Sequence, residues 1–349
     1  MSTPSMTVPQ GSWVLVTGAT GFLASHIVKE FLERGYKVRG TVRDLVRAAW
    51  LNNLFKSYAE RNEFELCLVP DLAVDHAFDD AVKGMSAIAH VATITSFDPD
   101  PHNVIPPAVK GVRSIMEAAL TEPMVKELVF TSSFLATAMA VPGINTHVDD
   151  NTWNDTASQL AWAPPPYEPK RAGPVYSASK VASEKAVWEF VKEKNPHFTV
   201  NVISPAMILG EPLNSTHVET DYAWMKKLYY GDTMRLAFIP GLITVNVRDA
   251  AVLHVAAVLD SEVKNARLQA WGPYCNWNDI LAIMRRLYPD HEFVPDLANM
   301  ARLDLSTDLS KPLALLEKWT NQKGWSSLEE ITAEALGPVV ASKQLRQPE

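Results

Sequence analysis

The sequence predicts an α/β protein in which a parallel sheet is covered by helices on both faces and is followed by a smaller lobe. Two observations support this fold class. Short apolar runs, typical of buried parallel strands, alternate with segments of helical apolar spacing through residues 1–204. A turn containing two glycines, Gly18 and Gly21, joins the first apolar run to the first helical segment.

The elements follow in order along the chain. Strands are expected at Trp13–Val16, Lys37–Val42, Phe64–Val69, Ser86–Ala92, Leu128–Ser132 and Phe198–Ser204. Helices are expected at Phe22–Leu32, Asp44–Tyr58, Ile105–Leu120 and from Pro174 to Phe190. Because strands connected through helices pair in parallel, residues 1–204 are expected to form a Rossmann-type doubly wound sheet.

Regular alternation ends at Pro205, and residues 205–349 are expected to form mainly a substrate-binding lobe. The chain is expected to return to the first domain around residues 243–260. The pieces expected here are an amphipathic helix with flanking loops in Leu213–Arg235, a strand at Thr244–Val247, a helix from Asp249 to Leu259, and a helix at Asn276–Leu287 capped by Asn278. Residues 141–174 are rich in Pro, Asn, Asp and Trp, and a segment of this length without periodicity is often functional.

Composition limits the function. The chain has 47% hydrophobic residues and a formal charge of −8, so no basic surface for nucleic acid or an anionic membrane is expected. The longest apolar stretch, Ala250–Leu259, is too short to span a bilayer. Residues 1–10 lack the basic and apolar regions of a signal peptide, so the expected location is cytoplasmic. Metal-ligand spacing is absent, and no metal is expected.

The glycine turn predicts a dinucleotide site. A strand, a tight turn and a helix N-terminus bring free N–H groups and the positive end of the helix dipole together, where a pyrophosphate binds. Gly18 permits the turn and Gly21 lets the backbone approach the ligand closely. The residues expected to bind the cofactor here are Thr17, Gly18, Thr20, Gly21, Phe22 and Leu23.

The end of the second strand indicates which nicotinamide cofactor binds. An acidic residue about 20 residues past the glycines would bond the ribose 2′-hydroxyl of NAD. The sequence has Arg43 at this place, and Arg47 follows one helical turn later. A guanidinium pairs with a 2′-phosphate, so NADPH is the expected cofactor. Asp71 follows the third strand and is either an adenine ligand or a helix cap.

The candidate catalytic residues are Ser133, Tyr176 and Lys180, with Ser132 as the alternative serine. Tyr176 and Lys180 lie one helical turn apart and share a face. Lowering the pKa of a tyrosine from near 10 to near 7 takes roughly 4 kcal/mol. An ammonium at ~4–5 Å supplies some 3–4 kcal/mol at an effective dielectric of about 20. Tyr176 is then a competent proton donor for carbonyl reduction, with Ser133 holding the carbonyl oxygen.

These residues carry a resemblance to a known family. The motifs are Thr17-Gly18-Ala19-Thr20-Gly21-Phe22-Leu23-Ala24, Asp98-Pro99, Pro107-Ala108-Val109-Lys110-Gly111, Leu128 to Ser133, Tyr176 with Lys180, and Gly324 to Glu330. The chain resembles the extended short-chain dehydrogenase/reductases of the dihydroflavonol reductase group, and in particular its microbial NADPH-dependent aldehyde and carbonyl reductases. The resemblance implies that Arg43 binds the 2′-phosphate and that Asp71 and Leu72 flank the adenine. It also implies that Val91, Ala92, Thr93 and Pro205 lie along the pyrophosphate and nicotinamide.

Departures from the family narrow the substrate. Ala138 stands where plant dihydroflavonol reductases carry an asparagine, and Arg171–Val175 replaces the Asn-Trp-Tyr-Cys-Tyr stretch of cinnamoyl-CoA reductases. Phe134-Leu135-Ala136 lacks the carboxylate that sugar-nucleotide dehydratases place beside their serine. The residues that are candidates for substrate contact are Phe97, Phe134, Trp224, Met225 and Leu242.

The expected activity is NADPH-dependent reduction of hydrophobic or aromatic aldehydes and ketones to alcohols, by a monomer or homodimer. Two alternatives stay open. One is another member of the extended family, acting on a dihydroflavonol, steroid or sugar nucleotide. The other is a redox-sensing regulator that binds dinucleotide without turnover; such a protein does not need Ser133, Tyr176 and Lys180 in this order.

Overall fold

The structure is a computed structural model that describes residues 6–94, 96–139, 141–219 and 223–344. Its centre is a seven-stranded sheet in which all neighbouring strands are parallel. In spatial order the strands are β10 (Arg267–Ala270), β7 (Thr199–Pro205), β5 (Glu127–Thr131), β4 (Ala87–His90), β1 (Trp13–Val16), β2 (Lys37–Val42) and β3 (Phe64–Leu68). The order reverses between β4 and β1, which is where such sheets bind their ligands. The predicted Rossmann-type sheet is confirmed.

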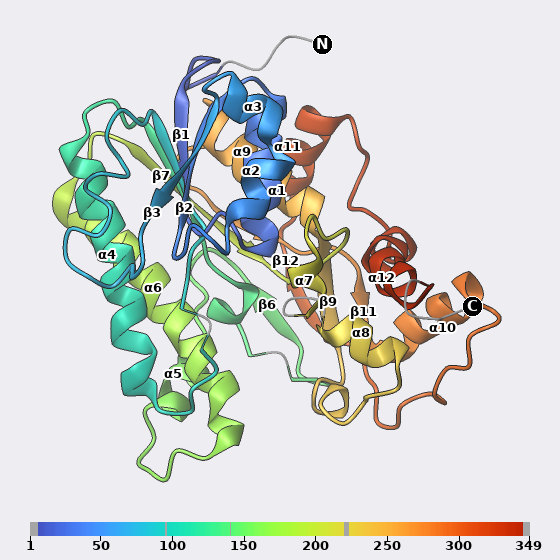
Figure 1. The fold of residues 1–349 in the computed structure, drawn as a ribbon. Coiled ribbons are helices and arrows are strands. Elements are labelled where there is room, and N and C mark those ends of the chain that lie inside the picture. Colours follow the sequence, from blue (N-terminus) through green and yellow to red (C-terminus); the bar gives the residue numbers. More distant parts are fainter. Residues whose placement is uncertain (1–5, 95, 140, 220–222, 345–349) are drawn as a thin grey trace.

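Helices cover both faces of this sheet. α4 (Ile105–Thr121) and α6 (Ala172–Lys194) pack together on one face. On the other face α9 (Val247–Leu259) packs against both α1 (Phe22–Glu33) and α11 (Ser310–Thr320), as Figure 1 shows. The polypeptide thus forms three layers, with the carboxyl ends of the strands at one edge of the middle layer.

The strands are apolar on both faces because each face contributes to a core. Along β1, Val14 and Val16 belong to the core beneath α1 and α9, whereas Leu15 belongs to the core beneath α4 and α6. Successive side chains of a strand point to opposite faces, so a strand covered on both sides needs apolar residues throughout. This is why the sequence shows continuous apolar runs here rather than alternation.

The second half of the chain builds a smaller lobe beside the carboxyl edge and also adds to the large sheet. A three-stranded sheet has the order β11 (Tyr274–Cys275), β9 (Leu242–Asn246) and β8 (Met207–Leu209). Helices of this part are α7 (Ser215–Glu219), α8 (Ala223–Tyr229), α10 (Trp277–Leu287) and α12 (Leu328–Gln344). The remaining helices are α2 (Ala49–Leu54), α3 (Lys56–Glu60) and α5 (Asp155–Ala161). The remaining strands, β6 (Thr146–Val148) and β12 (Leu305–Thr307), form a parallel pair. Short 3₁₀ turns lie at Pro101–Asn103, Phe134–Ala136, Pro169–Arg171 and Leu236–Phe238.

Several expected elements differ in the structure. The single helix expected over Asp44–Tyr58 is wrong: the Asp44 carboxylate accepts hydrogen bonds from Val46 N (2.8 Å) and Arg47 N (3.1 Å), and this turn delays the helix to Ala49. The cap of α10 is Asn276 rather than Asn278, because the Asn276 side chain accepts from the backbone N–H groups of Asn278 and Asp279.

Other differences lie in the segments where the sequence shows little periodicity. Residues 213–235 hold two short helices, α7 and α8, on either side of residues 220–222, which lie outside the described residues. Residues 141–174 contain the strand β6 and the helix α5 rather than only loop. The edge strand β10 was not expected. In the described part of the chain, no helix has the length and apolar character needed to cross a membrane.

Candidate active site

The glycine turn lies at the carboxyl end of β1, and its backbone requires glycine. Gly18 has a φ of +67°, in the left-handed region that L side chains rarely adopt. A Cβ on Gly18 would lie 3.1 Å from the Ala92 Cβ and 3.2 Å from the Ala92 Cα. Its N–H donates to the Thr41 hydroxyl of β2 (3.1 Å). The turn is therefore fixed against both neighbouring strands.

Thr17 joins the turn to the end of β4. Its hydroxyl accepts from the backbone N–H groups of Val91 and Ala92, both at 3.0 Å, and lies 3.0 Å from His90 Nδ1. Burial lowers the pKa of His90 to about 3, so this ring is neutral. The predicted cofactor residues Val91, Ala92 and Thr93 are half-buried and follow β4 directly, beside the turn. His90 is a buried residue that packs beneath this edge of the sheet.

Helix α1 presents its N-terminus to this turn. Gly21 N donates to Gly18 O (2.8 Å), which closes the turn. Within the described residues no side chain caps α1 at Gly21, and its first turn holds no acidic residue. The positive end of the helix dipole therefore faces the turn without a competing carboxylate, which fits an anionic pyrophosphate.

Two histidines connect the glycine turn to the smaller lobe, a contact that no pattern in the sequence indicated. The His217 ring of α7 hydrogen-bonds Thr20 O (Nε2 to O 3.0 Å), and His26 of α1 hydrogen-bonds Glu211 O (2.8 Å). Phe22 packs edge-on against both rings at 5.7 Å between centroids. The first residues of α1 are thus braced by the segment that follows β8.

The carboxyl end of β2 carries the charges expected for a 2′-phosphate. Arg43 is exposed directly after β2, and Arg47 is exposed one helical turn further on. Arg47 lies 3.9 Å from the Asp44 carboxylate, an exposed pair of little strength. Both guanidinium groups are accessible to a phosphate, so the residues present fit NADPH.

Asp71 and Leu72 lie after β3. The Asp71 carboxylate accepts a hydrogen bond from Ala73 N (2.8 Å), so it stabilises a local turn, and the residue is exposed. Leu72 packs over α4 at Gly111, where an added Cβ would come within 1.8 Å of the Leu72 side chain. Gly111 therefore leaves room for Leu72 beside the expected adenine position.

The three candidate catalytic residues meet at the carboxyl edge. Ser133 follows β5 and Tyr176 lies in the first turns of α6, with Lys180 one turn further. The Lys180 ammonium is buried and donates to Thr131 O (3.2 Å). In contrast to the lowering expected from Lys180, burial raises the pKa of Tyr176, and a hydrogen bond with the Ser133 side chain opposes that shift. Burial lowers the pKa of Lys180 to about 8.

The two adjacent serines have different partners. Ser133 is 7% exposed, and its hydroxyl accepts from Leu135 N (3.2 Å) while contacting Tyr176. Ser132 is 3% exposed and its hydroxyl donates to a carboxylate oxygen of Glu184 (2.5 Å). Ser133 is therefore the serine that faces the candidate proton donor.

The candidate substrate residues fall into two groups. Phe97 is 64% exposed and its ring lies 5.3 Å from that of Tyr176, while the half-buried Phe134 packs edge-on against Trp271. The other three lie in the smaller lobe: Trp224 is half-buried and packs near Trp277, whereas Met225 and Leu242 are buried in its core.

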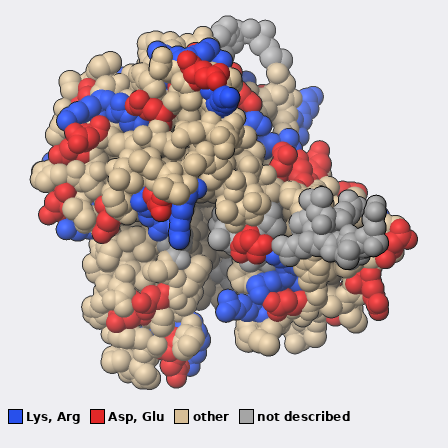
Figure 2. Space-filling model, viewed as in Figure 1, with Lys and Arg blue, Asp and Glu red and all other residues tan. Residues whose placement is uncertain are grey.

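Pro205 ends β7 and pairs with Ala270, at the same edge as the other candidate residues. Figure 2 shows a hollow between the part formed by α5 and α6 and the smaller lobe, with acidic and basic side chains interspersed on this face.

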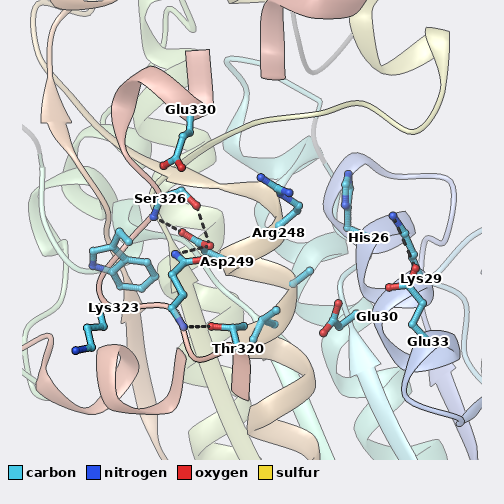
Figure 3. Close-up of a pocket in the computed structure, with 14 residues that line it drawn as sticks. His26, Lys29, Glu30, Glu33, Arg248, Asp249, Thr320, Lys323, Ser326 and Glu330 are labelled. Carbon is cyan, nitrogen blue, oxygen red and sulfur yellow. Dashed lines mark hydrogen bonds and ion pairs between the residues drawn. The ribbon is translucent and has the colours of Figure 1, made fainter. Parts of the chain in front are cut away.

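A separate cavity of about 590 Å³ lies between α1, α9 and residues 320–330 (Figure 3). Asp249 is buried there and accepts hydrogen bonds from Ser326 N (2.8 Å), Ser326 Oγ (3.1 Å) and Gln322 Nε2 (3.2 Å). Burial raises the pKa of Asp249. Its contacts tie the C-terminal segment to α9, and the residues that line the cavity do not include Ser133, Tyr176 or Lys180.

The chain can be placed among known proteins. Residues 15–270 match the 3-beta hydroxysteroid dehydrogenase/isomerase family. The chain belongs to this family. It is an extended short-chain dehydrogenase/reductase of the dihydroflavonol reductase-like group, as its motifs indicated, and an NAD(P)-dependent reductase.

Relatives match along nearly the whole chain. An NAD-dependent epimerase/dehydratase, terH, of Aspergillus terreus is 36% identical over 339 residues, which cover 96% of this chain and 99% of that protein. Aldehyde reductase 2 of Sporidiobolus salmonicolor is 34% identical, covering 96% of this chain and 98% of that protein. The crystal structure of yeast methylglyoxal/isovaleraldehyde reductase Gre2 with NADPH has a TM-score of 0.79 at 24% identity, covering 95% of this chain and 99% of that one.

Proposed function

We propose that this protein reduces aldehydes or ketones to alcohols with NADPH, using Tyr176 as the proton donor. The observation that carries the proposal is the placement of Tyr176 in contact with the Ser133 hydroxyl, with the buried Lys180 ammonium one helical turn away. This arrangement stands at the carboxyl edge beside the glycine turn. The relative named aldehyde reductase 2 supports the same activity.

The roles of the three side chains follow from charge. NADPH, when bound, supplies the hydride that reaches the carbonyl carbon. Tyr176 donates its proton to the carbonyl oxygen, and the Ser133 hydroxyl holds that oxygen as negative charge develops on it. Lys180 stabilises the phenolate that Tyr176 becomes, because its ammonium is buried and poorly screened by water.

The ionisation of Lys180 sets the working pH range. With the pKa of Lys180 lowered to about 8 by burial, the ammonium is present at neutral pH and is lost above pH 8. Loss of the ammonium makes the phenolate less stable and the phenol a weaker acid. We therefore expect the rate of reduction to fall as the pH rises past about 8.

The cofactor preference rests on Arg43 and Arg47. Both are exposed at the carboxyl end of β2, where an acidic residue would favour NAD. A guanidinium there pairs with the 2′-phosphate of NADPH through charge-assisted hydrogen bonds. The relative terH is named an NAD-dependent epimerase/dehydratase, so activity with NADPH and with NADH must be compared directly.

The substrate class is a hydrophobic carbonyl compound. Phe97 lies over the Tyr176 ring and leaves most of its own surface exposed, so an apolar or aromatic group can pack on it at the mouth of the site. Phe134, directly after Ser133, is half-buried beside Trp271. No carboxylate stands at 134–136, the place where one would serve a sugar-nucleotide dehydratase.

The test is a screen of NADPH oxidation over aryl ketones, aliphatic aldehydes and nucleotide sugars. We expect turnover with the first two classes and none with nucleotide sugars. Turnover confined to nucleotide sugars would contradict the proposal and favour another extended-family activity. Tight NADPH binding without turnover of any carbonyl compound would favour the non-catalytic sensor.

A further inference from the structure

A buried ion pair lies directly behind the candidate catalytic residues. Glu184 is on α6, one helical turn after Lys180, and its carboxylate accepts from Arg267 Nε of the edge strand β10 at 2.6 Å. The side chains are 0% and 4% exposed. Removing two charges from water costs several kcal/mol per ion. Because burying the Glu184–Arg267 pair is this costly, we expect the pair to have a function at the adjacent site.

The second carboxylate oxygen of Glu184 connects α6 to the end of β5. Ser132 Oγ donates to it at 2.5 Å, and Ser132 precedes Ser133 in the chain. Glu184 therefore holds the strand end that carries Ser133 against the helix that carries Tyr176 and Lys180. The Ser132 hydroxyl is thus bonded to Glu184, whereas the Ser133 hydroxyl contacts Tyr176.

Arg267 reaches the other side of Ser133 through the segment 149–154. Its Nη1 group donates to the backbone oxygens of Asp149 (3.4 Å), Asp150 (3.1 Å) and Thr152 (2.8 Å), and its guanidinium lies 4.1 Å from the centre of the Trp153 ring.

The next residue, Asn154, continues this connection. Its Nδ2 group donates to Leu135 O at 2.8 Å, and its backbone N–H donates to Ala136 O at 3.0 Å. These two acceptors belong to the 3₁₀ turn that begins immediately after Ser133. The ion pair thus fixes the backbone both before and after Ser133.

We propose that Glu184 is a positioning residue for the reduction, held in place by Arg267. It sets Ser133 against Tyr176 and places a negative charge behind Lys180 that favours the ammonium form. This inference rests on the proposed function of the three catalytic residues. It assigns Glu184 an effect on the pH range of the reaction in addition to its effect on geometry.

The charges around Lys180 single out Glu184. Glu184 raises the pKa of Lys180 and so opposes the larger lowering that burial produces. From β4, His90 faces Lys180 but is neutral, because burial lowers the pKa of its ring to about 3. From α9, His254 contacts the Thr131 hydroxyl (2.9 Å) and is neutral as well, with a pKa lowered to about 4 by burial.

The charged side chains of α4 and α5 form ion pairs with α6 away from Lys180. Arg113 of α4 pairs with Glu189 at 3.7 Å, and Asp155 of α5 pairs with Lys185 at 3.0 Å, both on the exposed side of α6. On α6 itself, Tyr176 lies one helical turn before Lys180. The negative charge that favours the Lys180 ammonium therefore comes from Glu184.

The experiment compares three variants by the pH dependence of kcat for NADPH-dependent carbonyl reduction. Glu184→Gln removes the charge and keeps the shape. Ser132→Ala removes the hydrogen bond to the strand end and keeps the charge. Glu127→Gln is the matched control, since Glu127 is also a buried glutamate (2% exposed) but lies at the opposite, amino end of β5.

Each variant has a distinct expected result. In Glu184→Gln the fall of kcat at high pH moves to lower pH by about one unit, so that kcat at pH 8 drops about fivefold, while the KM for NADPH stays near that of the wild type. In Ser132→Ala kcat falls and the pH range stays in place. In Glu127→Gln neither changes.

A purely structural ion pair would give a different result. Glu184→Gln would then lower the unfolding temperature without moving the pH dependence, and that outcome would overturn the proposal. If Arg267 left alone prevents folding, the double variant Glu184→Gln/Arg267→Met removes both buried charges and is expected to fold. Its pH dependence is expected to shift in the same direction but by less, because the positive charge of Arg267 is removed together with the negative charge of Glu184.

Failure of the proposed function looks different from failure of this inference. If the wild-type protein reduces no carbonyl compound, or if Tyr176→Phe keeps its turnover, the proposed function fails. If the wild type is active and Tyr176→Phe is inactive, but Glu184→Gln behaves like Glu127→Gln, only the positioning role of Glu184 fails.

Discussion

Replacing Lys180 by methionine tests the electrostatic part of the mechanism. Methionine has nearly the same length as lysine and is apolar, so it fills the buried space behind Tyr176 without a charge. The lost hydrogen bond to Thr131 O (3.2 Å) is a secondary effect, because that oxygen is the carbonyl of a strand residue already paired in the sheet. The change therefore removes mainly the ammonium.

The expected size of the effect follows from the position of Lys180. Side chains one helical turn apart lie ~5 Å from each other, and at an effective dielectric of about 20 a unit charge stabilises the phenolate by some 3 kcal/mol. At about 1.4 kcal/mol per factor of ten, kcat is expected to fall by two orders of magnitude or slightly more. Since burial limits screening by salt, the loss is expected to persist at high ionic strength.

The assay is the loss of NADPH absorbance with a saturating aldehyde, together with NADPH binding measured by fluorescence. NADPH binding is reported separately from kcat, so that a loss of cofactor affinity is not mistaken for a loss of catalysis. A fall in kcat of less than tenfold, with NADPH binding intact, would refute the electrostatic role of Lys180. Lys180→Arg is the control, because it keeps the charge and is expected to retain more of the activity than the methionine variant.

Three further changes test other parts of the account. Arg43→Ala should weaken NADPH by about 1.5–3 kcal/mol and NADH much less, as measured by titration with each; equal losses would remove Arg43 from the 2′-phosphate site. Gly18→Ala should lower the free energy of unfolding by about 1–2 kcal/mol in urea denaturation and weaken NADPH, because of the φ of +67° and the contact with Ala92; unchanged stability would contradict the geometry of the turn. Burial raises the pKa of Glu127 to about 8, so its protonated form favours the fold, and that stability is lost as the pH rises through about 8. Glu127→Gln should therefore melt at a higher temperature than the wild type above pH 8, with the difference shrinking towards pH 5; a gap independent of pH would contradict this sign.

The strands and the positions of the candidate catalytic side chains could be predicted from the sequence because their signals are local. A covered parallel strand reads as a continuous apolar run, as in Trp13–Val16, and Tyr176 and Lys180 share a helix face through their spacing alone. The glycine turn is likewise recorded in two residues, Gly18 and Gly21. The contact between Ser133 and Tyr176 could be anticipated only because Ser133 follows the carboxyl end of β5 and Tyr176 lies near the start of α6, at the same edge of the sheet.

The parts that could not be predicted depend on contacts between distant segments. β10 contains Arg267 and Gln269, which are buried although polar, so a search for apolar runs passes over this strand. Arg267 is buried with Glu184 accepting from its Nε group and three backbone oxygens accepting from its Nη1 group, and these partners are far apart in the sequence. The break in the helix expected from Asp44 has a local cause, the Asp44 side chain that caps a turn, and an Asp at this place is a signal that was available.

The central claim is that the Tyr176 phenol gives its proton to the carbonyl oxygen. The most direct measurement is the rate of a single turnover by Tyr176→Phe with NADPH already bound, since this change removes one hydroxyl and keeps the ring that packs near Phe97. We expect the rate to fall at least about a hundredfold while NADPH binding is retained. A single-turnover rate close to that of the wild type would contradict the account.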